Sequence, residues 1–161
     1  MTRLAHDHII RREPEEVLAL LDSRGVNYDI LRHQPVYTCA QAAAARNVPL
    51  RNELKTLLIV TQKGFALLNI PGDKRISRGM ARLALSAHEF RLANSSEMRT
   101  LHVSVGTVSP LSLFGCRSLL DQQVLTLDWI TTNAGTLTLG LRIRVAHLLT
   151  ICAFEVSNLT C

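Results

Sequence analysis

Lys55 begins an apolar stretch of the sequence, and a loop containing glycine and proline follows about fifty residues later. The first segment, 54–60, reads LKTLLIV, and the second, 105–111, reads VGTVSPL. A lysine beside a buried strand is costly to keep charged unless its ammonium reaches a cleft or an anion. A loop with an early glycine offers backbone N–H groups that no side chain shields. Together the two segments predict a pocket that binds an anionic or carbonyl-bearing ligand.

Length and composition limit the class of protein. The chain has 161 residues, of which 47% are hydrophobic, so a single domain with a sizeable core is expected. No run approaches the roughly 18 apolar residues of a membrane helix. The first residues, MTRLAHDH, lack the apolar centre of a signal peptide. We therefore expect a cytoplasmic protein with no membrane partner.

The charge balance points to an anionic partner. The formal net charge is +5, and arginine supplies most of the cations because Lys55, Lys63 and Lys74 are the only lysines. The planar arginine fork binds two phosphate oxygens at once, so an RNA or nucleotide partner is permitted. Aromatic residues make up only 4% of the chain, which argues against base stacking as the main mode of recognition. A bound RNA would be held mostly through phosphate and sugar.

The first half of the chain alternates helical and strand patterns. Pro14 and the acidic residues after it predict the start of a helix that ends at Gly25. Thr38 is the expected N-cap of an alanine-rich helix over 38–46. The further expected elements are a strand at 28–33, a hairpin of 54–61 with 64–70, a helix at 77–85, a strand at 90–92 and a short helix from 95.

The second half predicts mainly strands. These are expected at 117–120, 124–130, 135–141 and 152–157, with a turn over 131–135 and a helix at 143–150. The pattern favours an α+β fold, in which one mixed, mostly antiparallel and curved sheet is flanked by helices. Residues 1–12 are expected to form a flexible N-terminal arm, and residues 13–161 the folded domain.

Four sequence stretches together resemble the YbaK/ProX family of aminoacyl-tRNA editing domains. That family acts as free-standing deacylases or as domains inserted in bacterial prolyl-tRNA synthetases. The four stretches are 28–45, 53–59, 71–85 and 105–113. Asn133, Thr136-Leu137 and the segment 142–149 complete the pattern, which spans nearly the whole chain from Val17 to Val156.

The resemblance implies an enzyme that hydrolyses the ester between an amino acid and the 3′ end of tRNA. It places Lys55 in the substrate pocket and gives the backbone of Gly106 the task of holding the substrate or the attacking water. N–H groups at 106–108 would stabilise the developing oxyanion. Further candidate substrate-binding residues are Thr38, Thr107, Val108, Ser109, Pro110, Asn133 and His33.

The family uses neither a cofactor nor a catalytic metal, so none is expected here. The expected partners are the acceptor end of a tRNA carrying a small amino acid (alanine, serine, threonine or cysteine) and, as a second candidate, an aminoacyl-tRNA synthetase. For several candidate residues a plain structural role is the alternative. His33 would bond backbone at the end of a strand, Thr38 would only cap its helix, and Asn133 would only shape a turn.

The sequence departs from the family pattern at two places. Many members have proline before the loop glycine, where this chain has Val105, and a His-Pro-Gly stretch where it has Trp129-Ile130-Thr131. Trp129 could narrow or reshape the pocket. The alternative to an editing enzyme is therefore a non-catalytic module that keeps the fold and binds tRNA or a synthetase.

The four cysteines offer a third alternative, a thiol enzyme. Cys39 and Cys116 are the candidate nucleophiles because they lie near other polar residues. No Cys-x-x-Cys pair occurs, so the sequence supports neither a zinc knuckle nor a thioredoxin-type motif. No histidine stands in a position that clearly pairs with either thiol.

Overall fold

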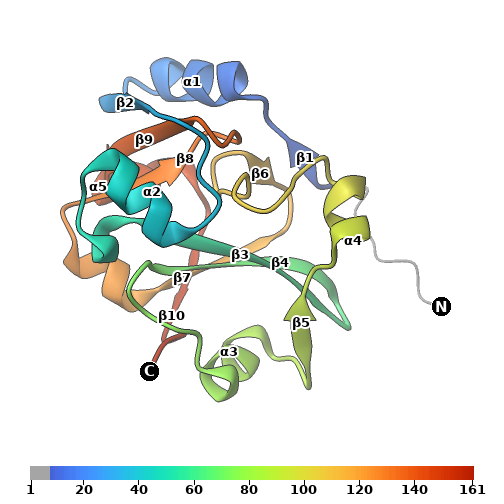
Figure 1. The fold of residues 1–161 in the computed structure, drawn as a ribbon. Helices are drawn as coiled ribbons and strands as arrows, with labels where there is room; N and C mark the ends of the chain where they lie inside the picture. The colour runs from blue at the N-terminus through green and yellow to red at the C-terminus, as the bar shows by residue number, and fades with distance from the viewer. Residues whose placement is uncertain (1–7) are drawn as a thin grey trace.

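A computed structural model of the protein describes residues 8–161 and is built around a five-stranded mixed sheet (Figure 1). The strands of this sheet follow the order β10-β7-β4-β3-β5. Their bounds are β3 Leu54–Thr61, β4 Gly64–Pro71, β5 Phe90–Leu92, β7 Arg117–Asp121 and β10 Glu155–Ser157. β4 pairs antiparallel with β3 and parallel with β7, so the predicted hairpin forms the centre of the sheet.

A second, antiparallel sheet has the strand order β2-β9-β8. Its strands are β2 (Tyr28–Arg32), β8 (Trp129–Asn133) and β9 (Leu139–Arg144). A single parallel bridge between Glu53 and Thr131 connects this sheet to the residue before β3. The predicted α+β fold with a mixed sheet is therefore confirmed, although its strands divide into separate hydrogen-bonded sheets.

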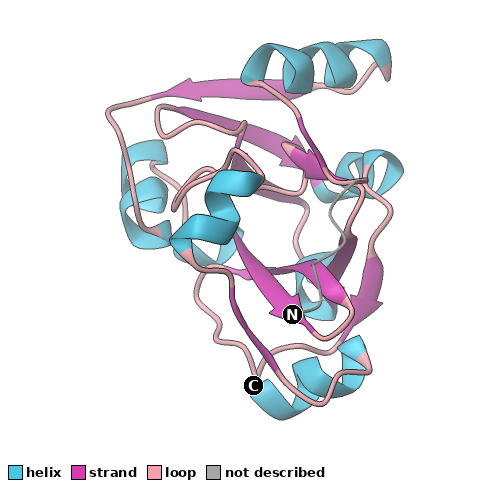
Figure 2. Cartoon of the chain, turned by 90° about the vertical axis from the view of Figure 1, so that its right-hand side faces the viewer, coloured by secondary structure: helices cyan, strands magenta, loops and turns pink. Residues whose placement is uncertain are grey.

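The helices lie on the outside of the sheets (Figure 2). Their bounds are α1 Pro14–Ser23, α2 Cys39–Arg46, α3 Arg78–Leu85, α4 Ser95–Thr100 and α5 Val145–Ile151. Of these, α1, α3 and α5 pack onto sheet faces. The predicted start signals operate as expected, since Pro14 opens α1 and the Thr38 hydroxyl accepts a hydrogen bond from the Gln41 N–H at the start of α2. The sequence pattern thus placed these helices to within a few residues.

The segment around residues 122–135 differs from the prediction. Residues Gln122–Thr126 form a 3₁₀ helix, which begins where the Asp121 carboxylate accepts a hydrogen bond from the Gln123 N–H. The strand predicted at 124–130 is instead β8, and the turn predicted at 131–135 begins only after Asn133. The apolar pattern misled the prediction because Val124 is buried in a 3₁₀ turn as deeply as in a strand.

The two faces of β9 have different environments. Leu139, Leu141 and Ile143 pack into a core that also contains Leu21 of α1 and Leu148 of α5. Side chains alternate along a strand, so Gly140, Arg142 and Arg144 lie on the opposite face. The antiparallel register places Asn133, Thr131 and Trp129 of β8 beside these three residues, in that order. This second face of the sheet positions the candidate functional residues.

The end of the predicted N-terminal arm is tied to the fold. Ile10–Arg11 forms β1, which pairs with β6 (Leu113–Phe114), and the Arg12 N–H donates a hydrogen bond of 2.7 Å to the Ser112 carbonyl. The part of the arm at residues 1–7 lies outside the described residues. The division into an arm and a domain at residue 13 stays a prediction.

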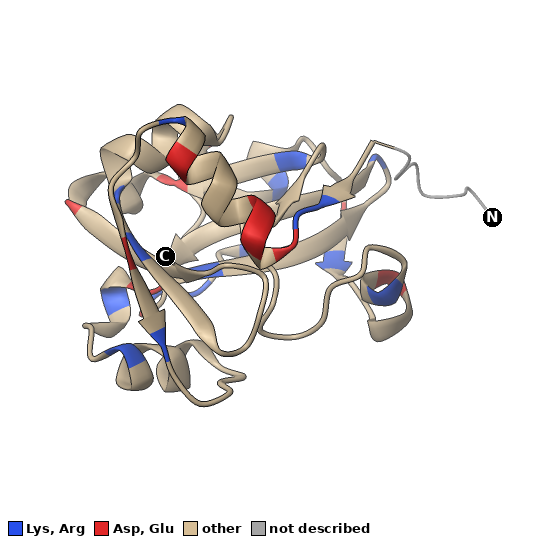
Figure 3. Cartoon of the chain, turned by 90° about the horizontal axis from the view of Figure 1, so that it is seen from above, with Lys and Arg blue, Asp and Glu red and all other residues tan. Residues whose placement is uncertain are grey.

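Basic residues are spread over the described surface. Seen from above, Lys and Arg lie on several separate elements and are interspersed with Asp and Glu (Figure 3). Within residues 8–161, no helix is long and apolar enough to cross a membrane. Net positive charge alone therefore does not single out one binding face.

Candidate functional site

A cavity of about 640 Å³ opens between the start of α2, the first half of β3 and the loop that follows α4. The residues lining it that the sequence singled out are Lys55 on β3, Thr38 before α2, Gly106 and Val108 in the loop, and Asn133 at the end of β8. Segments far apart in the chain thus meet at one concave surface. A cavity of this size, with mainly apolar walls and a few polar groups, is typical of a small-molecule site.

Lys55 is half-buried and lines this cavity from the second position of β3. Its ammonium donates a hydrogen bond of 2.9 Å to the carbonyl of Lys74, in the turn after β4. Gly72 allows this turn to lie close, because a Cβ there would stand 2.4 Å from the Leu50 carbonyl oxygen and 2.8 Å from the Cys39 sulfur. The Gly72-Asp73-Lys74 turn therefore positions the Lys55 ammonium at the cavity.

Gly106 brings the backbone of its loop against the opposite wall. Its φ of +88° is in the region that favours glycine, and a Cβ would stand 2.8 Å from Leu137 and 3.3 Å from the Val36 carbonyl oxygen. The N–H of Thr107 donates to the Ser104 carbonyl at 3.0 Å. The described residues contain no hydrogen-bond acceptor for the N–H of Gly106 or Val108. Two of the three N–H groups predicted to serve an oxyanion thus remain free.

Thr107, Ser109 and Pro110 are buried and do not line the cavity. The Thr107 hydroxyl accepts from the Ser104 N–H at 2.8 Å, and the Ser109 hydroxyl accepts from the N–H groups of Leu111 and Ser112 at 3.1 and 3.2 Å. These residues, predicted as substrate-binding, fix the shape of the loop and leave the contact surface to Val105, Gly106 and Val108.

Asn133 lines the cavity, but the hydrogen bonds of its amide are directed to the backbone. Its Nδ2 donates to the Val108 carbonyl at 2.9 Å, and its Oδ1 accepts from the Gly135 N–H at 2.8 Å. These contacts fit the turn reading, and the substrate-binding reading stays a prediction. Asn133 shapes the turn after β8 and also anchors the glycine–proline loop at the cavity wall.

Thr38 and His33 lie at different distances from the cavity. Thr38 lines it and caps α2 at the same time. His33 does not line it, and its ring bonds the Gln34 carbonyl at 2.8 Å and Nε of Arg46 at 3.1 Å. In this geometry Nδ1 donates to the carbonyl and Nε2 accepts from the guanidinium. The structural role weighed for His33 fits these contacts.

A buried ion pair between Arg46 and Glu53 was missed by the sequence analysis. Both side chains line the cavity, and each is at most 5% exposed. The Glu53 carboxylate accepts from the Arg46 guanidinium and from the Thr131 hydroxyl. Burial raises the pKa of Glu53, and the contacts with Arg46 and Thr131 oppose this rise. Through these contacts Glu53, the residue before β3, links Arg46 of α2 to Thr131 of β8 at the cavity wall.

Gly140 makes room for this ion pair. A Cβ at this position would stand 2.2 Å from Nε of Arg46, so only glycine leaves room for the guanidinium beside β9. The isolated bridge between Glu53 and Thr131 also joins the residue before β3 to β8 through the backbone. No single motif of the sequence signals this arrangement, because its members come from α2, the start of β3, β8 and β9.

Other cavity residues also escaped the sequence analysis. They include Tyr37, Thr56 and Met98. The Thr56 hydroxyl donates to Oδ1 of Asn69 at 2.8 Å, which ties the cavity wall to β4. Strand alternation on β3 places Thr56 and Lys55 on different faces, so both line the cavity only because it wraps around the start of the strand.

The cysteines do not offer a thiolate nucleophile. Burial raises the pKa of Cys39 to about 12 and that of Cys116 to about 11. Both thiols are therefore protonated at neutral pH, and the described residues include no group of three His, Cys, Asp or Glu side chains that could hold a metal. Cys39 lines the cavity as a small, neutral wall residue.

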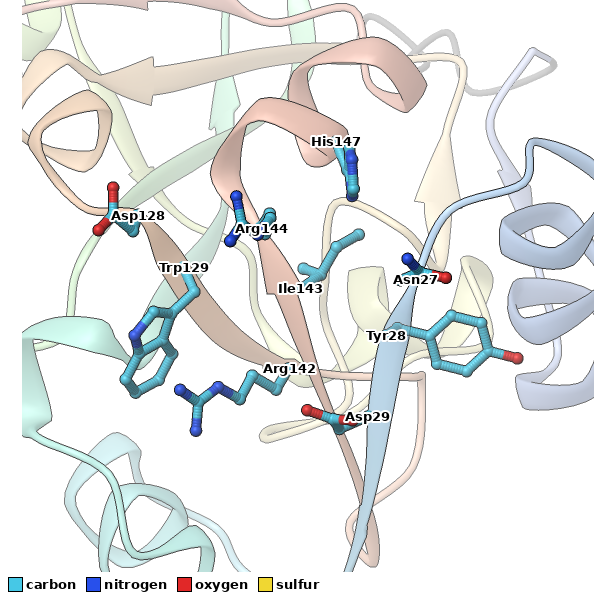
Figure 4. A pocket seen from close by; sticks show the side chains of 9 residues that line it. All are labelled: Asn27, Tyr28, Asp29, Asp128, Trp129, Arg142, Ile143, Arg144 and His147. Atoms are coloured by element: carbon cyan, nitrogen blue, oxygen red, sulfur yellow. The ribbon is translucent and has the colours of Figure 1, made fainter.

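Trp129 does not line this cavity, which corrects the expectation that it narrows the pocket. It lines a separate hollow of about 350 Å³, at the end of the three-stranded sheet where β2 and β8 begin (Figure 4). The His-Pro-Gly departure therefore reaches the Lys55 cavity only through Thr131, which bonds the lining residue Glu53, while Trp129 belongs to the separate hollow.

Comparison with known proteins identifies the family. The model of the aminoacyl-tRNA editing domain family matches residues 33–151. The crystal structure of a hypothetical protein superposes with a TM-score of 0.82 at 24% identity, covering 92% of this chain and 100% of the other. That of a "putative trans-editing enzyme for prolyl tRNA synthetase" gives 0.81 at 24% identity, covering 92% and 96%. The two superpositions show the fold, and the family model spans most of the chain. The protein therefore belongs to the aminoacyl-tRNA editing domain family, of the YbaK/ProX type.

Proposed function

We propose that the protein is a trans-editing deacylase that hydrolyses the ester of a mischarged tRNA. The observation that carries this proposal is the meeting of three groups at one cavity: the Lys55 ammonium, the free N–H groups of the Gly106 loop, and Asn133, which anchors that loop. Family membership supports the substrate class, because editing domains act on aminoacyl-tRNA.

The cavity offers a plausible route for ester hydrolysis without a protein nucleophile. A water molecule attacks the ester carbonyl carbon, and the adjacent ribose hydroxyl orients it. The carbonyl oxygen becomes an oxyanion, which the N–H groups of Gly106 and Val108 stabilise. The ester C–O bond then breaks, and a proton from the water passes to the departing ribose oxygen. The products are a free amino acid and a free tRNA 3′ end.

Lys55 supplies positive charge in this scheme. Its ammonium faces the cavity while one of its protons is held by the Lys74 carbonyl, so two N–H donors remain for the ligand. A terminal phosphate or the ester carbonyl oxygen would accept them. Positioning of the water and the ester contributes most of the rate, since an aminoacyl ester is already reactive.

The walls favour a small amino acid. Apolar surface comes from Leu57, Leu58, Val105 and Met98. Tyr37 and Cys39 line the cavity at the start of α2. A cavity of about 640 Å³ that also holds a terminal adenosine leaves room for a short side chain. An apolar wall discriminates by only about 1–3 kcal/mol for each methylene, so we expect activity on one or two of alanine, serine, threonine and cysteine.

The second candidate function is a non-catalytic module that binds tRNA or a synthetase. The hydrogen bond between Lys55 and Lys74 favours it, because this bond gives the lysine a structural role without any substrate. Val105, which stands where many family members have proline, lines the cavity and changes its entrance.

A deacylation panel separates the two functions. Purified protein is incubated with tRNAs charged with alanine, serine, threonine, cysteine and proline, and the remaining ester is measured. If the protein is a deacylase, we expect rapid hydrolysis of the tRNA esters of one or two of the small amino acids at a low ratio of protein to tRNA. Spontaneous rates on all five, together with measurable binding of uncharged tRNA, would favour the binding module.

A further inference from the structure

Trp129 and Arg142 form a stacked pair on the open face of the three-stranded sheet. The Arg142 guanidinium carbon lies 3.7 Å from the centre of the tryptophan ring, and the two side chains lie side by side in Figure 4. The backbone of Trp129 is held by a hydrogen bond of 2.9 Å from the Asn52 side chain. The ring is thus part of a fixed surface on which another planar group can stack.

The hollow beside this pair carries two cations that form no ion pair. Arg142 and Arg144 are exposed, and neither is paired with a carboxylate within residues 8–161. Two carboxylates also line the hollow: Asp29 lies opposite Arg142 in the pairing of β2 with β9, and Asp128 points away from the other side chains in Figure 4. Both guanidinium groups can therefore bind an anionic ligand, Arg142 beside a neighbouring carboxylate and Arg144 without one.

The hollow and the Lys55 cavity lie at opposite ends of β8. Trp129, Thr131 and Asn133 lie on the same face of this strand, and Asn133 lines the cavity. Thr131, between the other two, is fully buried against Glu53, so a bound strand would pass over the Arg46–Glu53 pair. At about 3.3 Å for each residue, Trp129 stands about 13 Å from Asn133. A stacked nucleic-acid strand rises about 3.4 Å for each nucleotide, so roughly four nucleotides, or fewer if extended, cover this distance.

We propose that Trp129 and Arg142 form a stacking site for a base in the unpaired 3′ strand of the tRNA whose terminal ester occupies the Lys55 cavity. Arg144 would contact a phosphate of this strand. This inference rests on the proposed function for its substrate. It adds a base contact to the expectation, drawn from the low aromatic content, that phosphate and sugar mostly hold the RNA.

The only tryptophan of the chain makes a direct test possible. Its fluorescence reports on this hollow alone, and a base stacked on the ring quenches it. The protein is titrated with a short, uncharged single-stranded RNA ending in CCA, and with the same sequence in a duplex. We expect saturable quenching by the single strand and at least fivefold weaker binding of the duplex. Equal quenching by both, or none by the single strand, would overturn the stacking site.

Variants test the contribution of the site to catalysis. Loss of a stacked base contact predicts that Trp129→Ala and Arg142→Gln each lower kcat/KM for aminoacyl-tRNA at least fivefold relative to kcat/KM for the aminoacyl ester of adenosine alone. Trp129→Phe keeps an aromatic face and should restore most of the loss. Arg82→Ala, which removes an exposed charge from α3, is the matched control and should change neither value.

The two proposals fail separately. The fluorescence titration uses uncharged RNA, so it tests the stacking site even in a protein that hydrolyses nothing. Suppose that the unaltered protein hydrolyses aminoacyl-tRNA while Trp129→Ala leaves the ratio of the two kcat/KM values unchanged. That result would support the deacylase and overturn the stacking site.

Discussion

The side chain of Asn133 donates a hydrogen bond of 2.9 Å to the carbonyl of Val108 and so joins the end of β8 to the glycine–proline loop. The same amide accepts a hydrogen bond from the Gly135 N–H, which closes the turn after the strand. This hydrogen bond fixes the position of the loop that carries the free N–H groups relative to the end of β8. Precise placement of these donors is what the proposed chemistry requires.

Replacing Asn133 tests this anchor. We expect Asn133→Ala to lower the free energy of unfolding by about 1–3 kcal/mol, because the Val108 carbonyl loses its donor in a partly buried site. Deacylation should fall as well. Asn133→Asp keeps the acceptor for Gly135 but faces the Val108 carbonyl with a carboxylate, so it should be no more active. Urea unfolding measures stability, and Asn158→Ala, which changes an exposed asparagine, is the control. A fully active, fully stable Asn133→Ala would exclude the anchor.

The buried pair of Arg46 and Glu53 predicts a strong effect on stability. Arg46→Met leaves the Glu53 carboxylate buried without its cation, and such a change costs about 3–5 kcal/mol. Adding Glu53→Gln removes the uncompensated charge, so the double variant should be more stable than Arg46→Met alone. Denaturant unfolding of the single and double variants gives the coupling. Additive losses would show that the two side chains do not interact.

Gly140 offers an independent test of the same region. Gly140→Ala should destabilise the protein, because the new Cβ would stand 2.2 Å from Nε of Arg46 and displace the guanidinium. Gly79→Ala is the matched comparison. Gly79 lies in α3 with nothing within 4 Å of its Cβ position, so this change should stabilise the protein by about 0.4–1 kcal/mol. Opposite signs of the two changes in melting temperature are expected, and equal signs would contradict the packing of Arg46.

The thiols predict a dependence of stability on alkaline pH. Burial raises the pKa of Cys39 and Cys152 from their ordinary value of 9.0 to about 12. Because the folded pKa is the higher one, their contribution is complete below pH 9 and is lost as the pH rises toward 12. The free energy of unfolding should therefore fall between these values, and less steeply in Cys152→Ala. If the free energy of unfolding falls equally steeply in Cys152→Ala, the loss of stability at alkaline pH comes from groups other than this thiol.

Cys39 is expected to be dispensable for hydrolysis. Its thiol is protonated at neutral pH and lines the cavity as a wall, so Cys39→Ala should retain activity to within a few-fold. Steady-state deacylation at pH 7 measures this. Complete loss of activity in a folded Cys39→Ala would revive the thiol mechanism weighed for Cys39 and Cys116.

Local sequence signals predicted much of the fold. Helix starts were found because Pro14, Thr38 and Ser77 act within three or four residues of themselves. The hairpin of β3 and β4 was found because both strands are continuous apolar runs around a glycine turn. The 3₁₀ turn at 122–126 was missed because its adjacent valine and leucine resemble a strand, although only Val124 is buried.

The candidate site was predicted only in part. Lys55 and Gly106 stand out because a lysine in an apolar run and a loop glycine need special surroundings. Arg46 and Glu53 look like ordinary surface charges, and only the tertiary fold buries them against Gly140. Thr107 and Ser109 were assigned to the substrate because sequence alone cannot tell a loop hydroxyl that faces a ligand from one that bonds its own backbone.

The most direct test of the central claim is single-turnover hydrolysis of the preferred aminoacyl-tRNA by Lys55→Met. This change keeps the aliphatic stem in the sheet and removes the ammonium that faces the cavity, and Lys63→Met, in the exposed turn between β3 and β4, is the matched control. We predict a loss of at least a hundredfold for Lys55→Met, a folded protein by circular dichroism, and an unchanged rate for Lys63→Met. Hydrolysis by Lys55→Met at the rate of the unaltered protein would contradict the assignment of the cavity as the deacylation site.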